Sequence, residues 1–176
     1  MNKFFLIILL ITLGSCRTVI NQTEVRVDLS GKHLKAIPKS VLDNKNIEFL
    51  DLGSSEITFY PPLSALKDPN SNHLTELPER IGELSKLKTL ILNTNNLKSL
   101  PISITKLERL EVLDLSINHE LVIVNELEKS KKLPSLKTLK IIDVKMDRDA
   151  YNTLKQALNP DIKIIVSIEE YFESME

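Results

Sequence analysis

Short stretches of alternating apolar and variable residues recur along this chain, and a polar turn residue follows most of them. Leu90-Ile91-Leu92 and Leu113-Asp114-Leu115 are two examples. Alternation over so few residues predicts a half-buried β-strand. Such a strand is too short to be stable alone and needs neighbours stacked on it. Because the strands recur in one direction, they must form a parallel sheet with crossovers between them.

The segments between the predicted strands repeat as well. The sequence N-H-L-T-E-L-P-E-R-I-G-E-L begins at Asn72, and N-N-L-K-S-L-P-I-S-I-T-K-L begins at Asn95. Asn72, Asn95 and Asn118 follow one another at intervals of 23 residues. A fixed period in this range predicts a solenoid. The asparagine amide can satisfy backbone groups where the chain turns out of the sheet, and the proline and apolar pairs suit a short helical turn across the core.

From Leu87 to Leu107 the chain reads L-x-x-L-x-L-x-x-N-x-L-x-x-L-P-x-x-I-x-x-L. This stretch resembles the leucine-rich-repeat (LRR) family in its 23-residue form. The resemblance implies an α/β fold over residues 23–145, a short solenoid with a curved parallel sheet on its concave side and short helices or turns on its convex side. A plain amphipathic helix bundle is the alternative, but a bundle does not require asparagine and proline at one phase in each copy.

The repeat is interrupted before Asn72. If Lys32, Ser55 and Asn72 are successive asparagine-equivalent positions, the intervals are 23 and then only 17 residues. Residues 58–71 contain several prolines, so we expect irregular coil there and a gap or bulge in the sheet between the second strand and the strand at Leu90. Repeat decay is one explanation. The other is a binding feature in which Tyr60, beside two prolines, is a rigid aromatic anchor.

The pattern changes again after Asn118. Residues 123–132 read as a charged helix and residues 136–141 as a strand. A helix is then predicted over residues 148–158 with Asp147 as its N-cap, followed by a closing strand over residues 162–166. We interpret residues 146–176 as a C-terminal helix–strand cap, because the last repeat of a solenoid must seal the open end of the core.

The N-terminus reads as an export signal over residues 1–15, with a charged start and a ten-residue apolar run over residues 4–13. The ending Leu13-Gly14-Ser15-Cys16 resembles the lipobox of bacterial lipoproteins. That resemblance implies cleavage before Cys16, acylation of Cys16 (palmitate included), a tether over residues 16–22, and attachment to a membrane of the cell envelope, facing the periplasm or the exterior. An ordinary secreted protein with an incidental cysteine is the alternative, but the A-x-A pattern of an ordinary cleavage site is absent.

Charge and motif content narrow the function. From Cys16 onward the chain carries 22 basic and 24 acidic residues, a net charge of −2, which gives no nucleic-acid footprint. We find no nucleophile, phosphate-loop or dinucleotide motif, and expect neither a cofactor nor a metal. His33, His73 and His119 share a phase in what read as alternate repeats, about 10 Å apart, too far to hold one ion. We interpret them as solvent-facing turn residues.

The variable positions between the strand leucines point away from the core and onto the concave surface. Asp28, Asp51 and Asp114 share one phase and predict an acidic stripe, with Ile91 and Val112 as an apolar patch beside it. The residues that we expect to bind a partner are Asp28, Asp51, Thr89, Ile91, Asn93, Val112, Asp114 and Lys140. The other interpretation is that these are ordinary solvated positions. The phase also places Glu48 on this surface.

The favoured hypothesis is a lipid-anchored module that binds a protein or peptide and has no catalysis of its own. The alternative is a structural or inhibitory envelope protein that occludes a partner rather than recruiting it. An enzyme ranks third, since the LRR ligases of bacteria carry catalysis in a separate domain with its own cysteine. This chain has only Cys16.

Overall fold

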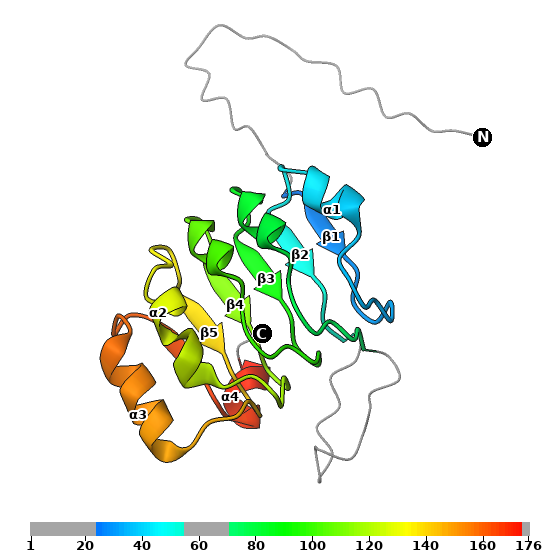
Figure 1. Cartoon of the computed structure of the whole chain (residues 1–176). Helices are drawn as coiled ribbons and strands as arrows, with labels where there is room; N and C mark the ends of the chain where they lie inside the picture. Colours follow the sequence, from blue (N-terminus) through cyan, green and yellow to red (C-terminus); the bar gives the residue numbers. More distant parts are fainter. Residues whose placement is uncertain (1–23, 55–70, 174–176) are drawn as a thin grey trace, which may run out of the picture.

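The computed structural model describes residues 24–54 and 71–173, and Figure 1 shows them as a row of strands backed by short helices. All six strands lie in one parallel sheet whose order in space is their order in the chain. They are β1 (Arg26–Asp28), β2 (Phe49–Asp51), β3 (Thr89–Ile91), β4 (Val112–Asp114), β5 (Thr138–Lys140) and β6 (Lys163–Ile165). The helical elements are α1 (Lys39–Asp43), η2 (Glu79–Glu83), η3 (Ile102–Lys106), η4 (Ile123–Glu126), α2 (Leu127–Ser130), α3 (Arg148–Ala157) and α4 (Ile168–Glu173). The predicted short solenoid is confirmed.

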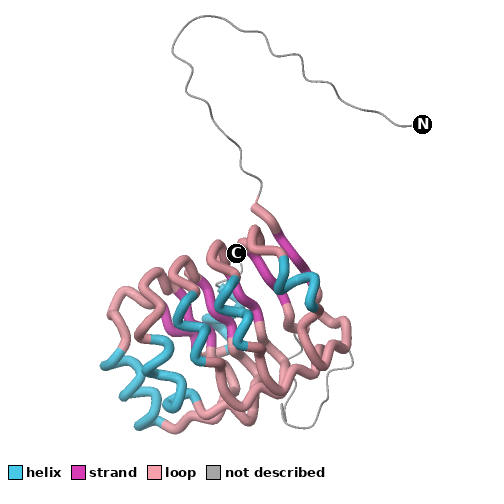
Figure 2. Tube along the Cα trace, turned by 45° about the horizontal axis from the view of Figure 1, so that its top comes forward, coloured by secondary structure: helices cyan, strands magenta, loops and turns pink. Residues whose placement is uncertain are grey.

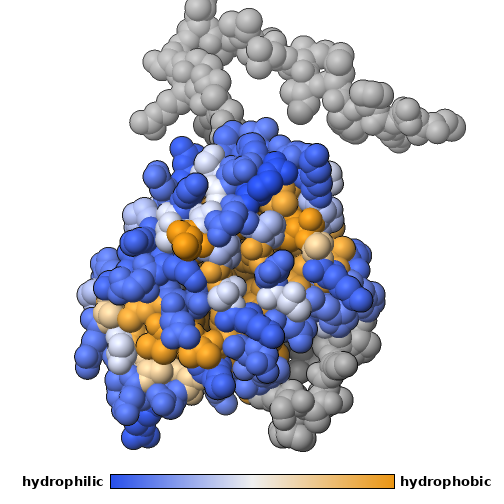
Figure 3. Space-filling model, viewed as in Figure 1, coloured by the Kyte–Doolittle hydropathy of each residue, from blue (hydrophilic) through white to orange (hydrophobic). Residues whose placement is uncertain are grey.

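The core lies between the sheet and the helical turns that cover one side of it (Figure 2). The middle residue of each central strand points into this core, so Leu50, Leu90, Leu113 and Leu139 pair in register and are fully buried. Burial of a leucine side chain contributes about 2 kcal/mol, so this stack is a main source of stability. The convex surface in Figure 3 shows apolar residues gathered toward its middle and hydrophilic residues around its rim.

The asparagines after the strands form a buried hydrogen-bond ladder. The Asn95 amide donates to the carbonyls of Leu92 (3.1 Å) and Leu52 (2.9 Å), and its Oδ1 accepts from the Leu74 N–H. Asn118 repeats the arrangement one turn later. The residues before Asn95 and Asn118 have a left-handed backbone, with φ of 54° at Thr94 and 57° at Ile117. This conformation costs about 1–2 kcal/mol for a β-branched residue, which the ladder offsets.

The ladder also corrects the repeat assignment around Asn72. The Asn72 amide donates to the carbonyls of Leu52 (2.8 Å) and Leu29 (2.9 Å), the contacts that Asn95 and Asn118 make in their own turns. Asn72 therefore closes the turn that begins with β2. The asparagine position of that turn is Asn72 and not Ser55. The separation from Leu52 to Asn72 is 20 residues, compared with 3 in the next turn, so the apparent short repeat is an insertion.

The expected gap in the sheet is wrong. β2 and β3 pair directly, with Phe49 opposite Thr89 and Leu50 opposite Leu90. The insertion leaves the sheet undisturbed because it lies within the turn between Leu52 and Asn72, after the strand has ended. Tyr60, proposed as an aromatic anchor, and most of the irregular segment 58–71 lie outside the described residues, as do residues 1–15, Cys16 and the tether.

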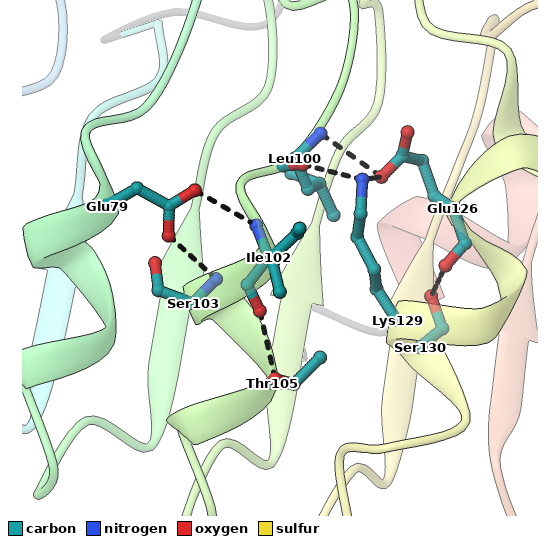
Figure 4. A network of polar contacts seen from close by, with 8 residues as sticks. All are labelled: Glu79, Leu100, Ile102, Ser103, Thr105, Glu126, Lys129 and Ser130. Atoms are coloured by element: carbon teal, nitrogen blue, oxygen red, sulfur yellow. Dashed lines mark hydrogen bonds and ion pairs between the residues drawn. The ribbon is translucent and has the colours of Figure 1, made fainter.

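Hydrogen bonds between successive turns hold the convex side together (Figure 4). α1, η2 and η3 each begin directly after a proline, whose fixed φ sets the chain direction. The Glu79 carboxylate accepts from the N–H groups of Ile102 and Ser103, at the start of the next turn. The buried Glu126 carboxylate likewise accepts from the Leu100 N–H (3.1 Å) and Lys129 (2.8 Å). Each turn thus satisfies backbone groups of its neighbour.

The C-terminal elements follow the sequence prediction closely. The Asp147 carboxylate caps α3 by accepting from the Ala150 N–H at 2.7 Å, and β6 adds the last strand to the sheet. α4 was not predicted. Ile168 of α4 packs against Ile142 and the fully buried Ile165, which lies in β6 at a phase that faces away from the main core. α4 therefore lies on the concave side of the sheet.

Candidate functional site

The concave face consists of two rows of side chains, because alternate strand residues point to the same side. Strand pairing is in register throughout, so equivalent positions line up across the sheet. The first row is Arg26, Phe49, Thr89, Val112, Thr138 and Lys163. The second row is Asp28, Asp51, Ile91, Asp114, Lys140 and Ile165. Seven of the eight residues predicted to bind a partner therefore lie in these rows, and Asn93 is the exception.

Phe49, which the sequence analysis missed, occupies the β2 position of the first row. Glu48 was assigned to this surface, but it lies three residues from Asp51 and cannot share its side of a strand. Instead, Glu48 forms an ion pair with Lys88 before the strands begin. The Arg26 guanidinium lies over the Phe49 ring, 3.5 Å from its centroid. The two-residue spacing from Phe49 to Asp51 was the available signal.

The two neighbouring aspartates of the second row, Asp28 on β1 and Asp51 on β2, differ in environment. Asp28 is exposed and accepts from the Ser30 hydroxyl and N–H, and these hydrogen bonds lower its pKa. Asp51 is half-buried, and its carboxylate accepts from the Gly53 N–H at 2.9 Å. Loss of hydration raises the pKa of Asp51 from 3.8 to about 6, and the nearby charges of Asp28 and Asp114 act in the same direction. Asp51 therefore titrates near pH 6.

The continuous acidic stripe predicted from sequence is not present. Asp114 is only 1% exposed and accepts from the Ser116 N–H at 3.0 Å, so its carboxylate is not a surface group. Ile91 lies between Asp51 and Asp114 in the row. Lys140, the neighbour of Asp114, is half-buried, and its burial lowers its pKa although Asp114 acts against this effect. Asp114 thus belongs to a covered part of the face, and the half-buried Lys140 lies beside it.

Asn93 is also buried, at 2% exposure, and is not available to a partner as predicted. Its Oδ1 accepts from the Ser54 N–H at 3.0 Å. This contact needs a glycine at position 53, because a Cβ there would lie 2.5 Å from the same oxygen. Asn93 therefore fixes the backbone where the insertion begins, and its role is structural.

The concave face has an open half and a closed half. The open half, over β1–β3, consists of Arg26, Asp28, Phe49, Asp51, Thr89 and Ile91, all exposed or half-buried. In the closed half, over β4–β6, Asp114 and Ile165 of the second row are buried and Ile168 of α4 packs on Ile165, while Lys140 and the first row stay half-buried or exposed. Val112 remains half-buried in the first row, at the boundary. The accessible chemistry is two carboxylates beside a guanidinium–phenyl stack and an aliphatic side chain.

The histidines are arranged differently from the prediction. His33 and His73 lie in adjacent turns, because Asn72 closes the second turn, and their rings stack with centroids 6.1 Å apart. His119 lies apart from them, with its Nδ1 3.5 Å from an Asp143 carboxylate oxygen. Within residues 24–54 and 71–173, no three His, Cys, Asp or Glu side chains are grouped so that they could hold a metal ion.

These features decide the fold. A parallel sheet with one strand per turn, a ladder of buried asparagines and proline-led turns on the far side are together the architecture that the sequence resemblance implies. The fold is a leucine-rich-repeat solenoid. In the part of the chain that the structure describes, no helix of this solenoid is long and apolar enough to cross a bilayer.

Comparison with known proteins finds similarity among solved structures. No protein-family profile matches the chain, and no curated protein matches it. Among solved structures, an LRR protein of Leptospira interrogans is similar, with 20% sequence identity and a TM-score of 0.38. The match covers 83% of this chain and 55% of that protein, so this chain spans about half of its length.

Proposed function

We propose that this chain is a protein-binding module of the bacterial cell envelope, and that the open half of its concave face is the surface that binds the partner. The observation that carries the proposal is the unequal coverage of the face. Its residues over β1–β3 remain accessible, whereas Asp114 and Ile165 are buried in the second row over β4–β6 and Ile168 of α4 packs on Ile165. The strands hold these side chains in fixed register, so a partner meets a preorganised array and loses less entropy on binding.

The chemistry of the open half selects a partner segment with a basic residue beside an apolar one. Asp28 and Asp51 lie on neighbouring strands about 4.8 Å apart, and together they suit one cationic group. Asp51 is partly dehydrated, so a cation placed against it interacts more strongly than at a fully hydrated site. Ile91 and the Phe49 ring, with Arg26 over it, supply the apolar surface on either side.

The proposal gives the chain no catalytic step. Among the described residues of the open half there is no nucleophile with a base in hydrogen-bond reach, and its two carboxylates accept from nearby backbone N–H groups. Binding alone accounts for this set of side chains.

Capture from envelope extracts tests the binding surface. Asp28→Asn with Asp51→Asn removes both charges and keeps the hydrogen-bond acceptors, so the fold is retained. We expect this double variant to hold the partner up to about thirtyfold more weakly, since each lost ion pair contributes up to about 1 kcal/mol. The matched control is Glu76→Gln with Glu120→Gln, which removes two exposed carboxylates elsewhere. Equal capture by the wild type and the Asp28/Asp51 variant would show that the two carboxylates are not part of the interface.

We further propose that Cys16 carries the lipid anchor. The support is the Leu13-Gly14-Ser15-Cys16 motif after an apolar run and the use of a single cysteine at that place. Several acyl chains give stable attachment, because each buried methylene contributes about 0.8 kcal/mol. Cells fed labelled palmitate should label the wild type and not Cys16→Ala. An unlabelled wild type would contradict the proposed lipid anchor. It would not bear on the proposed binding surface.

A further inference from the structure

The described chain enters the solenoid at the edge where the strands begin. A backbone hydrogen-bond series runs along this edge. The Glu48 N–H donates to the Val25 carbonyl (2.9 Å), Lys88 to Glu48 (2.8 Å) and Glu111 to Lys88 (2.8 Å). Val25, Glu48, Lys88 and Glu111 are therefore consecutive along one line, the strand-start edge. The first described residue, Glu24, lies at the end of this line.

Charges within the strand-start edge are largely paired. Glu48 forms an ion pair with Lys88, and Glu111 forms one with Lys137 at 2.7 Å. The hydrogen bond from Lys88 lowers the pKa of Glu48, so this carboxylate stays ionised beside its cation. These four residues thus contribute no net charge to the edge.

The residues that come just before these ion-paired residues in the sequence line a cavity, and the cations among them are unpaired. It has a volume of about 390 Å³ and is lined by Ser85, Lys86, Lys106, Glu108 and Arg109. Ser85-Lys86 comes just before Lys88, and Glu108-Arg109 just before Glu111. Within the described residues none of the three cations has an ion-pair partner, although Lys86 donates to the Asn46 side chain at 2.8 Å. With Glu108 as the single carboxylate among them, the lining residues carry an excess of two positive charges.

We propose that the strand-start edge faces the membrane and that this basic pocket binds the phosphate groups of anionic phospholipids. The proposal rests on the lipid anchor at Cys16, because the anchor brings this edge to the bilayer. Glu24 is eight residues after Cys16, a span of at most about 28 Å. Arg109 precedes β4, three strands from β1, about 14 Å along the edge. The pocket therefore lies within reach of the surface to which the chain is attached.

This orientation complements the binding surface. With the strand-start edge on the membrane, the sheet stands upright and the open half faces sideways, parallel to the bilayer. Basic side chains near an anionic surface each favour this orientation, so three cations together bias a tethered domain strongly. The pocket would thus fix how Asp28 and Asp51 are presented to a partner in the same membrane.

The test couples the chain from Cys16 to Glu176, which keeps every described residue, through its single cysteine to a maleimide lipid in vesicles. It therefore does not depend on acylation in cells, so failure of the anchor and failure of the pocket are separate results. The chain has no tryptophan, so one introduced residue reports its own surroundings. Ser85→Trp reports the pocket, and Asn96→Trp reports the opposite edge. Spin-labelled headgroups quench a tryptophan near the surface.

On vesicles that contain phosphatidylglycerol, we expect strong quenching of Ser85→Trp and weak quenching of Asn96→Trp. In pure phosphatidylcholine, or at high salt, the difference should disappear. Lys86→Gln, Lys106→Gln and Arg109→Gln together should reduce the equilibrium constant for the facing orientation about fivefold per cation. The matched control Lys35→Gln, Lys98→Gln and Lys155→Gln should leave it unchanged.

Two outcomes would overturn the proposal. One is equal quenching at both edges on anionic vesicles, which would mean that the pocket does not orient the domain. The other is displacement by inorganic phosphate well beyond the effect of chloride at equal ionic strength, which would assign the pocket to a small soluble anion.

Discussion

The two halves of the concave face have the same backbone geometry and different surroundings. Asp51 and Asp114 occupy the same position on strands two apart, and each accepts a hydrogen bond from the N–H two residues later. Asp51 is half-buried and Asp114 is fully buried, and α4 packs on Ile142 and Ile165 at the last strands. Position in the repeat thus decides where a side chain points, and the element packed on that side decides whether a partner can reach it.

The largest expected effect comes from reversing the charge in the closed half. Asp114→Lys should destabilise the protein by about 4 kcal/mol, because the new ammonium is buried and the hydrogen bond to Ser116 is lost. Asp28→Lys, the same change in the open half, should stay within about 0.5 kcal/mol. Chemical denaturation measures both. Similar losses at the two positions would show that the halves do not differ in coverage.

Removal of the α4 contact should have the next largest effect. Ile165→Ala leaves a cavity under Ile168 and should cost about 3 kcal/mol. Ile102→Ala is the matched control, since Ile102 is 74% exposed and should change stability little. Hydrogen exchange in Ile165→Ala should rise in α4 and stay unchanged in β1–β3. Unchanged exchange in α4 would mean that the helix is held without Ile165.

A pH-dependent gain is expected in the open half. The folded state raises the pKa of Asp51 from 3.8 to about 6, so it binds the proton more tightly than the unfolded state. The wild type therefore loses stability as the pH rises from about 4 to 6. Asp51→Asn should be more stable by about 1 kcal/mol at pH 7, after allowance for screening at a half-exposed site. This gain should vanish toward pH 4. Denaturation across this range measures the gain, and a gain that is independent of pH would contradict the expectation.

The smallest effect is expected at the outer end of the open half. Arg26→Gln removes the stack on Phe49 and the ion pair with Glu24 (2.8 Å). Both are exposed, so stability should fall by only about 0.5 kcal/mol, and less at high salt. Thermal melts at low and high salt check this. A loss of several kcal/mol would mean that the pair is part of the folding core.

The insertion shows where sequence prediction fails for a physical reason. The 23-residue spacing correctly placed the turns that end at Asn95 and Asn118, since each asparagine follows its own strand by a few residues. Asn72 carries the same motif, but an insertion separates it in the sequence from its strand, β2. Counting from Ser55 therefore created an extra turn and a gap that the sheet does not have. The carbonyl groups that Asn72 binds identify its true strand.

The assignment of side chains to the concave face was predictable where the strand register was known. Asp28, Thr89, Ile91 and Val112 all lie in the two rows as their phase predicts. Glu48 was misassigned because it lies three residues before Asp51, and only residues an even number apart share a face of a strand. Phe49, two residues before Asp51, occupies that position instead.

The sequence by itself determined the repeating architecture, because leucine, asparagine and proline at fixed phase satisfy local needs for burial, backbone hydrogen bonds and chain direction in each turn. It also determined the helix cap at Asp147 and the strand that follows α3. Tertiary structure alone decided which half of the concave face is open, and that Asn72 serves β2. Both depend on contacts between residues far apart in the chain, such as Leu29 with Asn72, which local spacing does not encode.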